Sequence, residues 1–97
     1  MPTYIMLGSW TDQGIRHVRE SPERLDAARQ LCRQHGAEIT HFYMTFGAHD
    51  MVVVIDAPND EAFARLAVSI AKGGNIRTTT LKAFDEDQYR RIIGSIG

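Results

Sequence analysis

The sequence predicts one α+β domain in which strands and helices follow the order β-α-β-β-α-β, with a further helix at the C-terminus. Four runs rich in β-branched and aromatic residues are bounded by turn-forming residues, as strands are. Two segments between them repeat apolar residues at helical spacing. A length of 97 residues, with 43% hydrophobic and 24% charged residues, fits a single globular domain, which we assign to residues 1–97.

The first strand is expected at residues 3–10, TYIMLGSW, which are apolar and aromatic. The turn-forming segment TDQG follows, and Ile15 and Val18 then suggest one short helical turn. A long helix is expected next, with Ser21 as N-cap and Pro22 at its first position, because proline disfavours helical geometry in the residue before it. This helix should end at Gly36, and its core-facing stripe is Leu25, Ala28, Leu31 and Cys32.

The segments 37–46, AEITHFYMTF, and 51–57, MVVVIDA, are the second and third strands, joined by the turn GAHD. Strict alternation in the second strand assigns its side chains to two faces, Ile39, His41, Tyr43 and Thr45 against Thr40, Phe42, Met44 and Phe46. Both faces of the third strand are apolar. That strand should therefore be covered on both sides.

The second long helix should begin after Pro58 with Asn59 as N-cap and end in the segment KGGN; its apolar stripe is Phe63, Leu66, Ala67 and Ile70. Residues 76–84, IRTTTLKAF, are a threonine-rich fourth strand. Asp85 and Gln88 have the spacing of a capping box for a C-terminal helix that carries Tyr89, Ile92, Ile93 and Ile96.

This order of elements is the split βαβ arrangement of a ferredoxin-like sandwich. Right-handed crossovers give an antiparallel four-stranded sheet in the order 4-1-3-2, with both long helices on one face. The other face would then expose apolar side chains of the third strand. We therefore expect the chain to pair with itself through this face as a homodimer, and an edge strand could extend the assembly further.

Charge and cysteine content narrow the classes of partner. The formal net charge of −1 gives no excess positive field for nucleic acid or anionic lipid, so neither is expected as a partner. The arginines between residues 16 and 33 alternate with acids, as on a solvated helix face. Cys32 is the only cysteine, and no leader or membrane span is evident, which favours the cytoplasm. The histidines lack close paired spacing, so no metal is expected. The segment GSWTDQG lacks the lysine and spacing of a phosphate loop, and no cofactor is expected.

Three glycine-bearing loops should meet at one end of the sheet in this topology. They are WTDQG after the first strand, GAHD in the hairpin, and GGN before the fourth strand. Glycine permits close backbone approach there, so a small ligand could be held among polar groups. The expected ligand-binding residues are Trp10, Thr11, Gln13, Gly14, Tyr43, Gly47, Asp50 and Asn75, with His49 beside them.

Two functions remain open on these residues. As a binding module, the chain would hold a small, partly apolar ligand between sheet and helices, with Trp10 and Tyr43 stacking and Gln13 and His49 orienting polar groups. As an enzyme, it would use His41 or His49 as general base, with Asp50 orienting the imidazole. Structural explanations compete with both: aspartate and histidine suit a hairpin turn, and His41 and Trp10 suit a subunit interface.

The segments MPTYIMLGSWTDQGI, SPERLDAAR, FYMTFGAHDMVVVIDAP and GNIRTTTLKAF together resemble the small GYD-domain proteins. The motif that gives this family its name falls on residues 47–50, where His49 stands in place of the expected tyrosine. The resemblance implies a fold of the dimeric α+β barrel superfamily. That superfamily includes cofactor-independent monooxygenases, isomerases, haem-degrading enzymes and ligand-binding proteins, so the resemblance implies a cleft and leaves its chemistry open.

Overall fold

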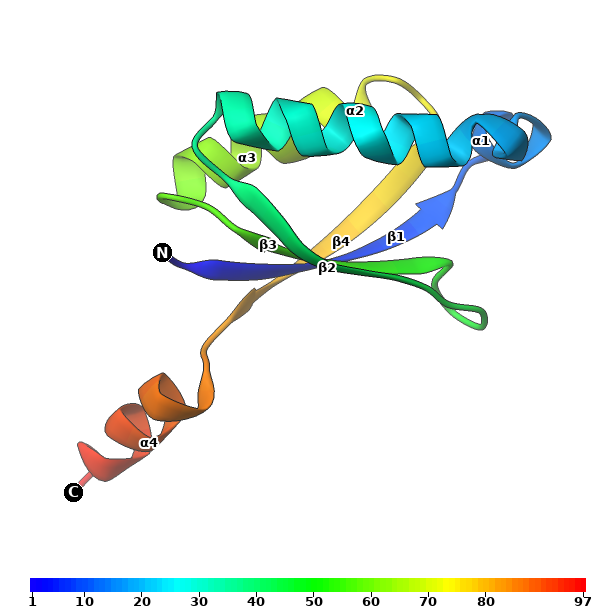
Figure 1. Cartoon of the computed structure of the whole chain (residues 1–97). Coiled ribbons are helices and arrows are strands. Elements are labelled where there is room, and N and C mark those ends of the chain that lie inside the picture. The colour runs from blue at the N-terminus through cyan, green and yellow to red at the C-terminus, as the bar shows by residue number, and fades with distance from the viewer.

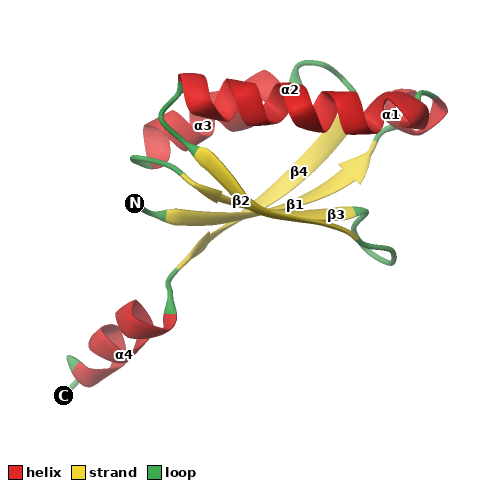
Figure 2. Ribbon diagram, viewed as in Figure 1, coloured by secondary structure: helices red, strands yellow, loops and turns green.

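The computed structural model describes residues 1–97 as a single antiparallel sheet with its two long helices on one face (Figure 2). Its elements are β1 (Thr3–Trp10), α1 (Asp12–Arg16), the 3₁₀ turn η1 (Val18–Glu20), α2 (Ser21–Gln34), β2 (Glu38–Met44), β3 (Met51–Asp56), α3 (Asp60–Ala71), β4 (Ile76–Ala83) and α4 (Glu86–Gly94). The strand order is β2-β3-β1-β4, and every neighbouring pair is antiparallel. The predicted ferredoxin-like topology is confirmed.

The core lies between the sheet and the two long helices, α2 and α3, which cover the same face (Figure 1). Alternate side chains of β1 and β3 point into it and are joined by residues of both helices: Tyr4, Met6, Met51, Val53, Ile55, Cys32, Phe63 and Leu66. The rings of Tyr4 and Phe63 stack with centroids 4.2 Å apart. Ile55 and Leu66 are fully buried. Burial of one such side chain contributes about 1.5–3 kcal/mol, so this interface is the main source of stability.

The start of α2 differs from the sequence-based expectation. Ser21 was expected to cap the helix from outside, but its backbone is helical, with φ −57° and ψ −42°. The turn η1 leads directly into α2, and the N–H of Ser21 donates to the carbonyl of Val18. This continuous winding offsets the steric cost of a helical residue before Pro22. Pro22 itself lies in the first turn of α2, where no N–H donor is needed, as expected.

A β-bulge in β2 changes which residues share a face. The expectation that Ile39 shares a face with His41 and Tyr43 is wrong, because the register shifts between Ile39 and His41. Ile39 lies opposite Ile55 and is buried under the helices, while His41 lies opposite Val54 on the open face. The extra residue, Thr40, absorbs the shift.

Two predicted helix caps are confirmed. The side chain of Asn59 accepts a hydrogen bond from the N–H of Ala62 at 2.9 Å and starts α3. At α4 the reciprocal bonds of a capping box are present, from Gln88 N to Asp85 Oδ1 at 2.7 Å and from Asp85 N to Gln88 Oε1 at 2.9 Å.

Helix α4 projects away from the domain on the side of the sheet opposite α2 and α3 (Figure 1). None of its residues is buried; its apolar side chains Tyr89, Ile92 and Ile93 are exposed, as is Ile96 just beyond its end. The open face of the sheet carries Ile5, Leu7, Val52, Val54 and Leu81. No helix of the chain has the length and apolar character needed to cross a membrane.

Candidate ligand cavity

The loop after β1 and the loop before β4 are joined by hydrogen bonds. Thr11 caps α1, and its N–H donates to the carbonyl of Asn75 at 3.1 Å. The side chain of Gln13 donates from Nε2 to the carbonyl of Gly73 at 3.1 Å and to Oδ1 of Asn75 at 3.0 Å. Two segments that are about 60 residues apart in the sequence are thus joined into one rim.

Close backbone approach at this rim depends on Gly14. The residue is buried, and a Cβ atom added to it would collide with the backbone carbonyl of Asn75. Backbone atoms cannot swing aside as a side-chain tip can. The loop therefore requires glycine at position 14 for a packing reason.

The hairpin between β2 and β3 is anchored to the same rim through Asp50. Its Oδ2 accepts from the N–H of Trp10 at 3.0 Å, and its own N–H donates to the carbonyl of Gly8 at 2.8 Å. Within the hairpin, Thr45 Oγ1 donates to the carbonyl of His49 at 2.7 Å. The carboxylate therefore fixes the end of β1 at Trp10, while the turn itself is closed by the main-chain carbonyl of Asp50, which accepts from the N–H of Thr45 at 2.8 Å.

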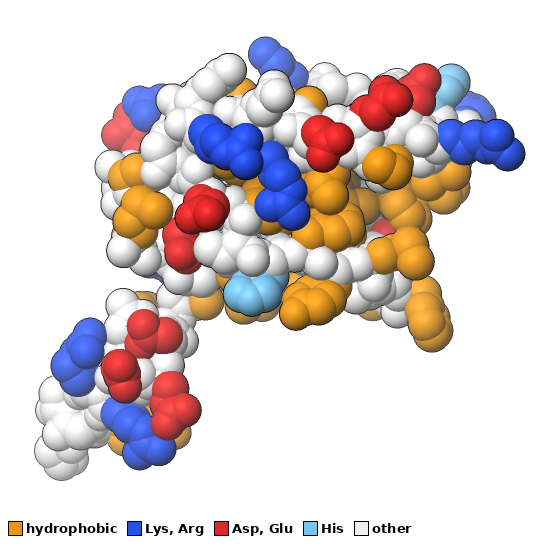
Figure 3. Space-filling view, in the orientation of Figure 1, with side chains coloured by type: hydrophobic (Ala, Val, Ile, Leu, Met, Phe, Trp, Pro, Cys, Tyr) orange, Lys and Arg blue, Asp and Glu red, His pale blue; other side chains and the backbone are white.

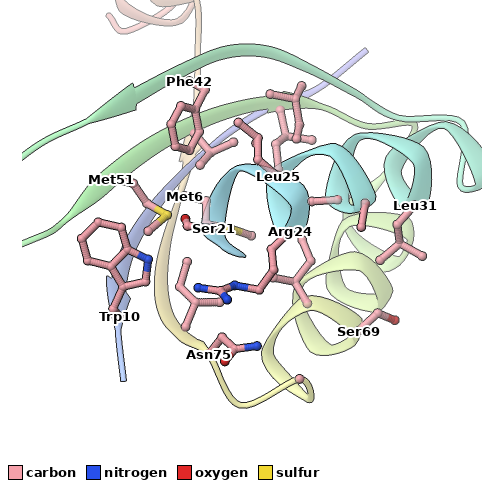
Figure 4. Close-up of a pocket in the computed structure, with 18 residues that line it drawn as sticks. Met6, Trp10, Ser21, Arg24, Leu25, Leu31, Phe42, Met51, Ser69 and Asn75 are labelled. Carbon is pink, nitrogen blue, oxygen red and sulfur yellow. The ribbon is translucent and has the colours of Figure 1, made fainter. Parts of the chain in front are cut away.

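A cavity of about 270 Å³ lies between the sheet and helices α2 and α3 (Figure 4). Thirteen of its 18 lining residues are hydrophobic, so its walls are mainly apolar. They come from all four strands, both long helices and the loop before β4: Met6, Trp10, Ser21, Arg24, Leu25, Ala27, Ala28, Leu31, Ile39, Phe42, Met51, Val53, Ile55, Ser69, Ile70, Gly73, Asn75 and Ile76.

Arg24 is the only charged residue in this lining. Its Nη1 donates to the carbonyl of His17 at 3.1 Å, and its Nη2 donates to the carbonyl of Gly14 at 3.4 Å. These bonds hold the guanidinium beside the rim, with Trp10 and Asn75 at the same end of the cavity (Figure 4).

The structure brings some of the predicted site residues to this cavity and separates others from it. Trp10 and Asn75 line it. The rim behind them is built by Thr11, Gln13, Gly14 and Asp50. His49 and Gly47 lie in the hairpin, outside the lining, and Gly47 has a positive φ of 111°.

Tyr43 and His41 occupy the open face of the sheet, on the side opposite the cavity. Their rings lie nearly parallel, with centroids 6.4 Å apart. In this chain, stacking of Trp10 and Tyr43 on one ligand would require the ligand to reach both faces of the sheet.

Sequence reasoning missed Arg24, which was grouped with the solvated arginines of the helix. The available signal is its spacing, since Ser21, Arg24, Ala28 and Leu31 follow each other at intervals of three and four residues. Residues at that spacing share one face of a helix, so Arg24 belongs to the edge of the apolar stripe.

Outside the cavity, Tyr4, Asp60 and Lys82 form a polar cluster where β1 meets the start of α3. The phenol of Tyr4 donates to Oδ1 of Asp60, which also lies 2.9 Å from Nζ of Lys82. Burial of the phenol, assisted by the nearby carboxylate, raises the pKa of Tyr4 to about 12. The hydrogen bond from Tyr4 and the contact with Lys82 lower the pKa of Asp60.

The remaining reactive side chains do not form a site. Burial raises the pKa of the Cys32 thiol, so little thiolate is available at neutral pH. No three His, Cys, Asp or Glu side chains gather in an arrangement that could hold a metal ion. The cavity is thus the most developed candidate site in the chain.

Comparison with known proteins places the chain in a family. The model of the GYD domain matches residues 4–93. The chain belongs to the GYD family. Among curated proteins, this GYD chain is 34% identical over 84 residues to a protein of Thermus thermophilus, covering 86% of this chain and 88% of that one. That relative is named "Glutamine synthetase and cystathionine beta-lyase binding protein".

Solved structures share the fold of this GYD domain. A crystal structure of an FFRP protein superposes with a TM-score of 0.61 at 20% identity, covering 87% of this chain and all (100%) of that chain. The leucine response regulatory protein of Mycobacterium tuberculosis gives a TM-score of 0.57 at 17% identity, covering 87% of this chain and 51% of that one. At such identities the likeness shows the fold alone.

Proposed function

We propose that this GYD-family chain is a homo-oligomeric binding module that holds a small, partly apolar ligand in the cavity under α2 and α3. The cavity itself carries the proposal. It has a volume of about 270 Å³, its walls are mainly apolar, and Trp10, Arg24 and Asn75 lie at one end of it. An apolar pocket with a few localised polar groups is the usual form of a small-molecule site.

The chemistry of the lining favours binding over catalysis at this place. The lining includes no histidine, cysteine, aspartate or glutamate. The alternative, an enzyme of the dimeric α+β barrel type, would need His41 or His49 to act as general base from outside this cavity. The binding proposal invokes no cofactor and no metal.

Filling the cavity tests the proposal. Ala28→Phe places a ring in the lining, whereas Ala64→Phe places the same ring on the exposed side of α3 as a matched control. Saturable binding of small apolar compounds, measured by isothermal titration calorimetry, should be lost in the first variant and kept in the second. If the wild-type chain binds no member of a panel of charged and neutral compounds, the proposal fails.

The homo-oligomer is supported by the uncovered face of the sheet. Its apolar side chains, Ile5, Leu7, Val52, Val54 and Leu81, have no helix over them, because α2 and α3 lie on the other face. A second copy of the chain offers a self-complementary cover of the same area. Sedimentation equilibrium at micromolar concentration should give a dimer or a larger oligomer, and a compact monomer would overturn this part of the proposal.

A second binding function, to another protein, is favoured by the Thermus relative and by the hairpin. The relative's printed name describes binding to two enzymes. In this chain Phe46, in the loop between β2 and β3, is 97% exposed, although its ring is apolar. Aromatic side chains are typical anchors of protein interfaces. Figure 3 shows hydrophobic side chains over the hairpin side of the molecule.

Co-migration with glutamine synthetase in size-exclusion chromatography tests this second function. Phe46→Ser should abolish co-migration, while Phe84→Ser, directly after β4, should preserve it. Absence of any complex with the wild-type chain would leave small-molecule binding as the function supported by the structure.

We also propose a cytoplasmic setting. The support is chemical: the only cysteine, Cys32, is a buried free thiol, as is usual for proteins of reducing compartments. Neither nucleic acid nor a lipid surface is a proposed partner, since the net charge is −1.

A further inference from the structure

The polar end of the cavity supplies hydrogen-bond donors and a positive charge. A guanidinium has five N–H donors and no acceptor. Arg24 uses one N–H on the carbonyl of His17 and one on the carbonyl of Gly14, and both acceptors are uncharged. Its other three N–H groups have no hydrogen-bond partner, and the side chain lines the cavity.

The charge of Arg24 has one partner, a long and mostly exposed ion pair with Glu20. The nearest carboxylate, that of Glu20, lies 3.8 Å from Nη1, and the Glu20 side chain is 66% exposed. Such exposed pairs one helical turn apart contribute little. The Arg24 side chain itself is only 27% exposed, and no acid lines the cavity. A ligand anion would therefore meet a partly desolvated cation whose only counter-charge is the exposed carboxylate of Glu20, outside the cavity lining.

Asn75 adds a second donor, and its amide orientation follows from its neighbours. The Gln13 atom that faces the carbonyl of Gly73 must be the nitrogen, because a carbonyl only accepts. The same nitrogen faces Asn75, so the Asn75 atom in that bond is the oxygen. This leaves the amide nitrogen of Asn75 free to donate toward a ligand.

Trp10 provides a third hydrogen-bond donor at this end of the cavity. Figure 4 draws the indole nitrogen of Trp10 on the side of the ring that faces Met51 and Arg24. An indole N–H donates and cannot accept. Three side chains at one end of the cavity therefore offer donors, while Met6, Leu25 and Ile70 line the apolar part.

We propose that the cavity selects a carboxylate carried on a small apolar body, and that Arg24 determines this selectivity. The inference rests on the proposed function of the same cavity. The planar fork of Arg24 matches the two oxygens of a carboxylate, and Trp10 and Asn75 supply further donors around them. A free amino acid is disfavoured, because the lining offers its ammonium group no carboxylate.

The test compares three probes of similar size that differ in charge: phenylacetate, phenylacetamide and phenylalanine. Isothermal titration calorimetry gives their affinities for the wild-type chain, and the fluorescence of Trp10, the only tryptophan, reports binding at the cavity. Phenylacetate should bind about tenfold or more tightly than either other probe. A second series, with 4-methylpentanoate, its amide and leucine, tests whether the same preference holds when the apolar part of the ligand is aliphatic.

Two variants assign the preference to Arg24. In Arg24→Gln the affinity for phenylacetate should fall to within about threefold of that for phenylacetamide. Arg33→Gln removes an exposed charge from the same helix and should leave the tenfold preference intact. If Arg24→Gln does not fold, as judged by circular dichroism, the wild-type comparison of acid with amide decides alone.

The outcomes distinguish the carboxylate preference from the proposed small-molecule binding function. Equal affinity for acid and amide would overturn the carboxylate preference and leave the proposed binding function standing. Equal or tighter binding of phenylalanine or leucine would overturn the exclusion of amino acids, and with it the inference. If no probe of either series binds, the proposed small-molecule function fails together with the inference.

Discussion

Asp50 and Trp10 are joined by a hydrogen bond in which the main-chain N–H of Trp10 donates to the Asp50 carboxylate at 3.0 Å. This single contact ties the β2–β3 hairpin to the last residue of β1. Since Trp10 also lines the cavity, the carboxylate positions a wall residue without touching the cavity itself.

Asp50→Ala should lower the free energy of unfolding by about 1–2 kcal/mol, because the N–H of Trp10 loses its acceptor. Urea denaturation measures the change. His49→Tyr, the matched control in the same turn, should stay within about 0.5 kcal/mol of wild type, because no side-chain hydrogen bond of His49 is lost. If His49→Tyr costs more than Asp50→Ala, the ring of His49 is a packing element.

Gly14→Ala should destabilise the domain by at least about 2 kcal/mol, because the new Cβ and the carbonyl of Asn75 would occupy the same space. Gly94→Ala, in α4, meets no neighbouring atom and should change the free energy of unfolding by less than about 0.5 kcal/mol. Thermal and urea melts of both variants check this contrast. Near-wild-type stability of Gly14→Ala would show that the rim can open at little cost.

Val53 and Val54 are adjacent in β3 but face opposite sides of the sheet. Val53→Glu should prevent folding, because its carboxylate would be buried under the helices without a partner. Val54→Glu should leave circular dichroism unchanged and shift the sedimentation profile toward monomer, because its carboxylate enters only the proposed interface. A folded Val54→Glu oligomer of wild-type size would show that subunits do not meet through this face.

Stability above pH 10 should depend on Tyr4. Its folded pKa is raised from 10.0 to about 12, so the folded form retains a proton that the unfolded chain loses. This contribution is complete below about pH 10 and disappears as the pH rises through about 12. In urea denaturation at a series of pH values, Tyr4→Phe should not show this loss of stability at alkaline pH. An unchanged profile in Tyr4→Phe would assign the loss to other groups.

At acid pH, the contribution of Asp60 to stability depends on pH in the opposite direction to that of Tyr4. Its folded pKa is lowered from 3.8, so its contribution is present above that value and is lost as the pH falls further. Asp60→Asn should flatten this acid-side dependence in the same melts. Retention of the full dependence in that variant would show that other carboxylates govern it.

The order of elements could be read from the sequence because short-range signals agree with the fold. Asn59 starts α3, the pair Asp85 and Gln88 starts α4, and the alternation in β3 gives its two faces. Each of these signals depends on neighbours within a few residues.

The expectations that were wrong depend on contacts that lie outside the sequence pattern of the element itself. Ser21 is helical because a preceding 3₁₀ turn winds into α2, and Ile39 changes face because the bulge depends on pairing with β3. Arg24 was missed since its position at the cavity depends on carbonyls of the preceding loop, at Gly14 and His17. Residue spacing predicts which side chains share a face of a helix. It does not predict which of those side chains contact a neighbouring loop, as Arg24 does.

The bulge at Thr40 also affects how the edges of the sheet can be used. Strand β2 is one edge, and its interrupted hydrogen-bond ladder offers a poor template for a strand of another molecule. The opposite edge, β4, pairs with β1 without interruption from Ile76 to Ala83, so its outward-facing N–H and C=O groups belong to a regular strand. Addition of a strand from another molecule is therefore favoured at β4, and because only this edge is open to it, such pairing would join two chains and could not continue into a fibril or a ring.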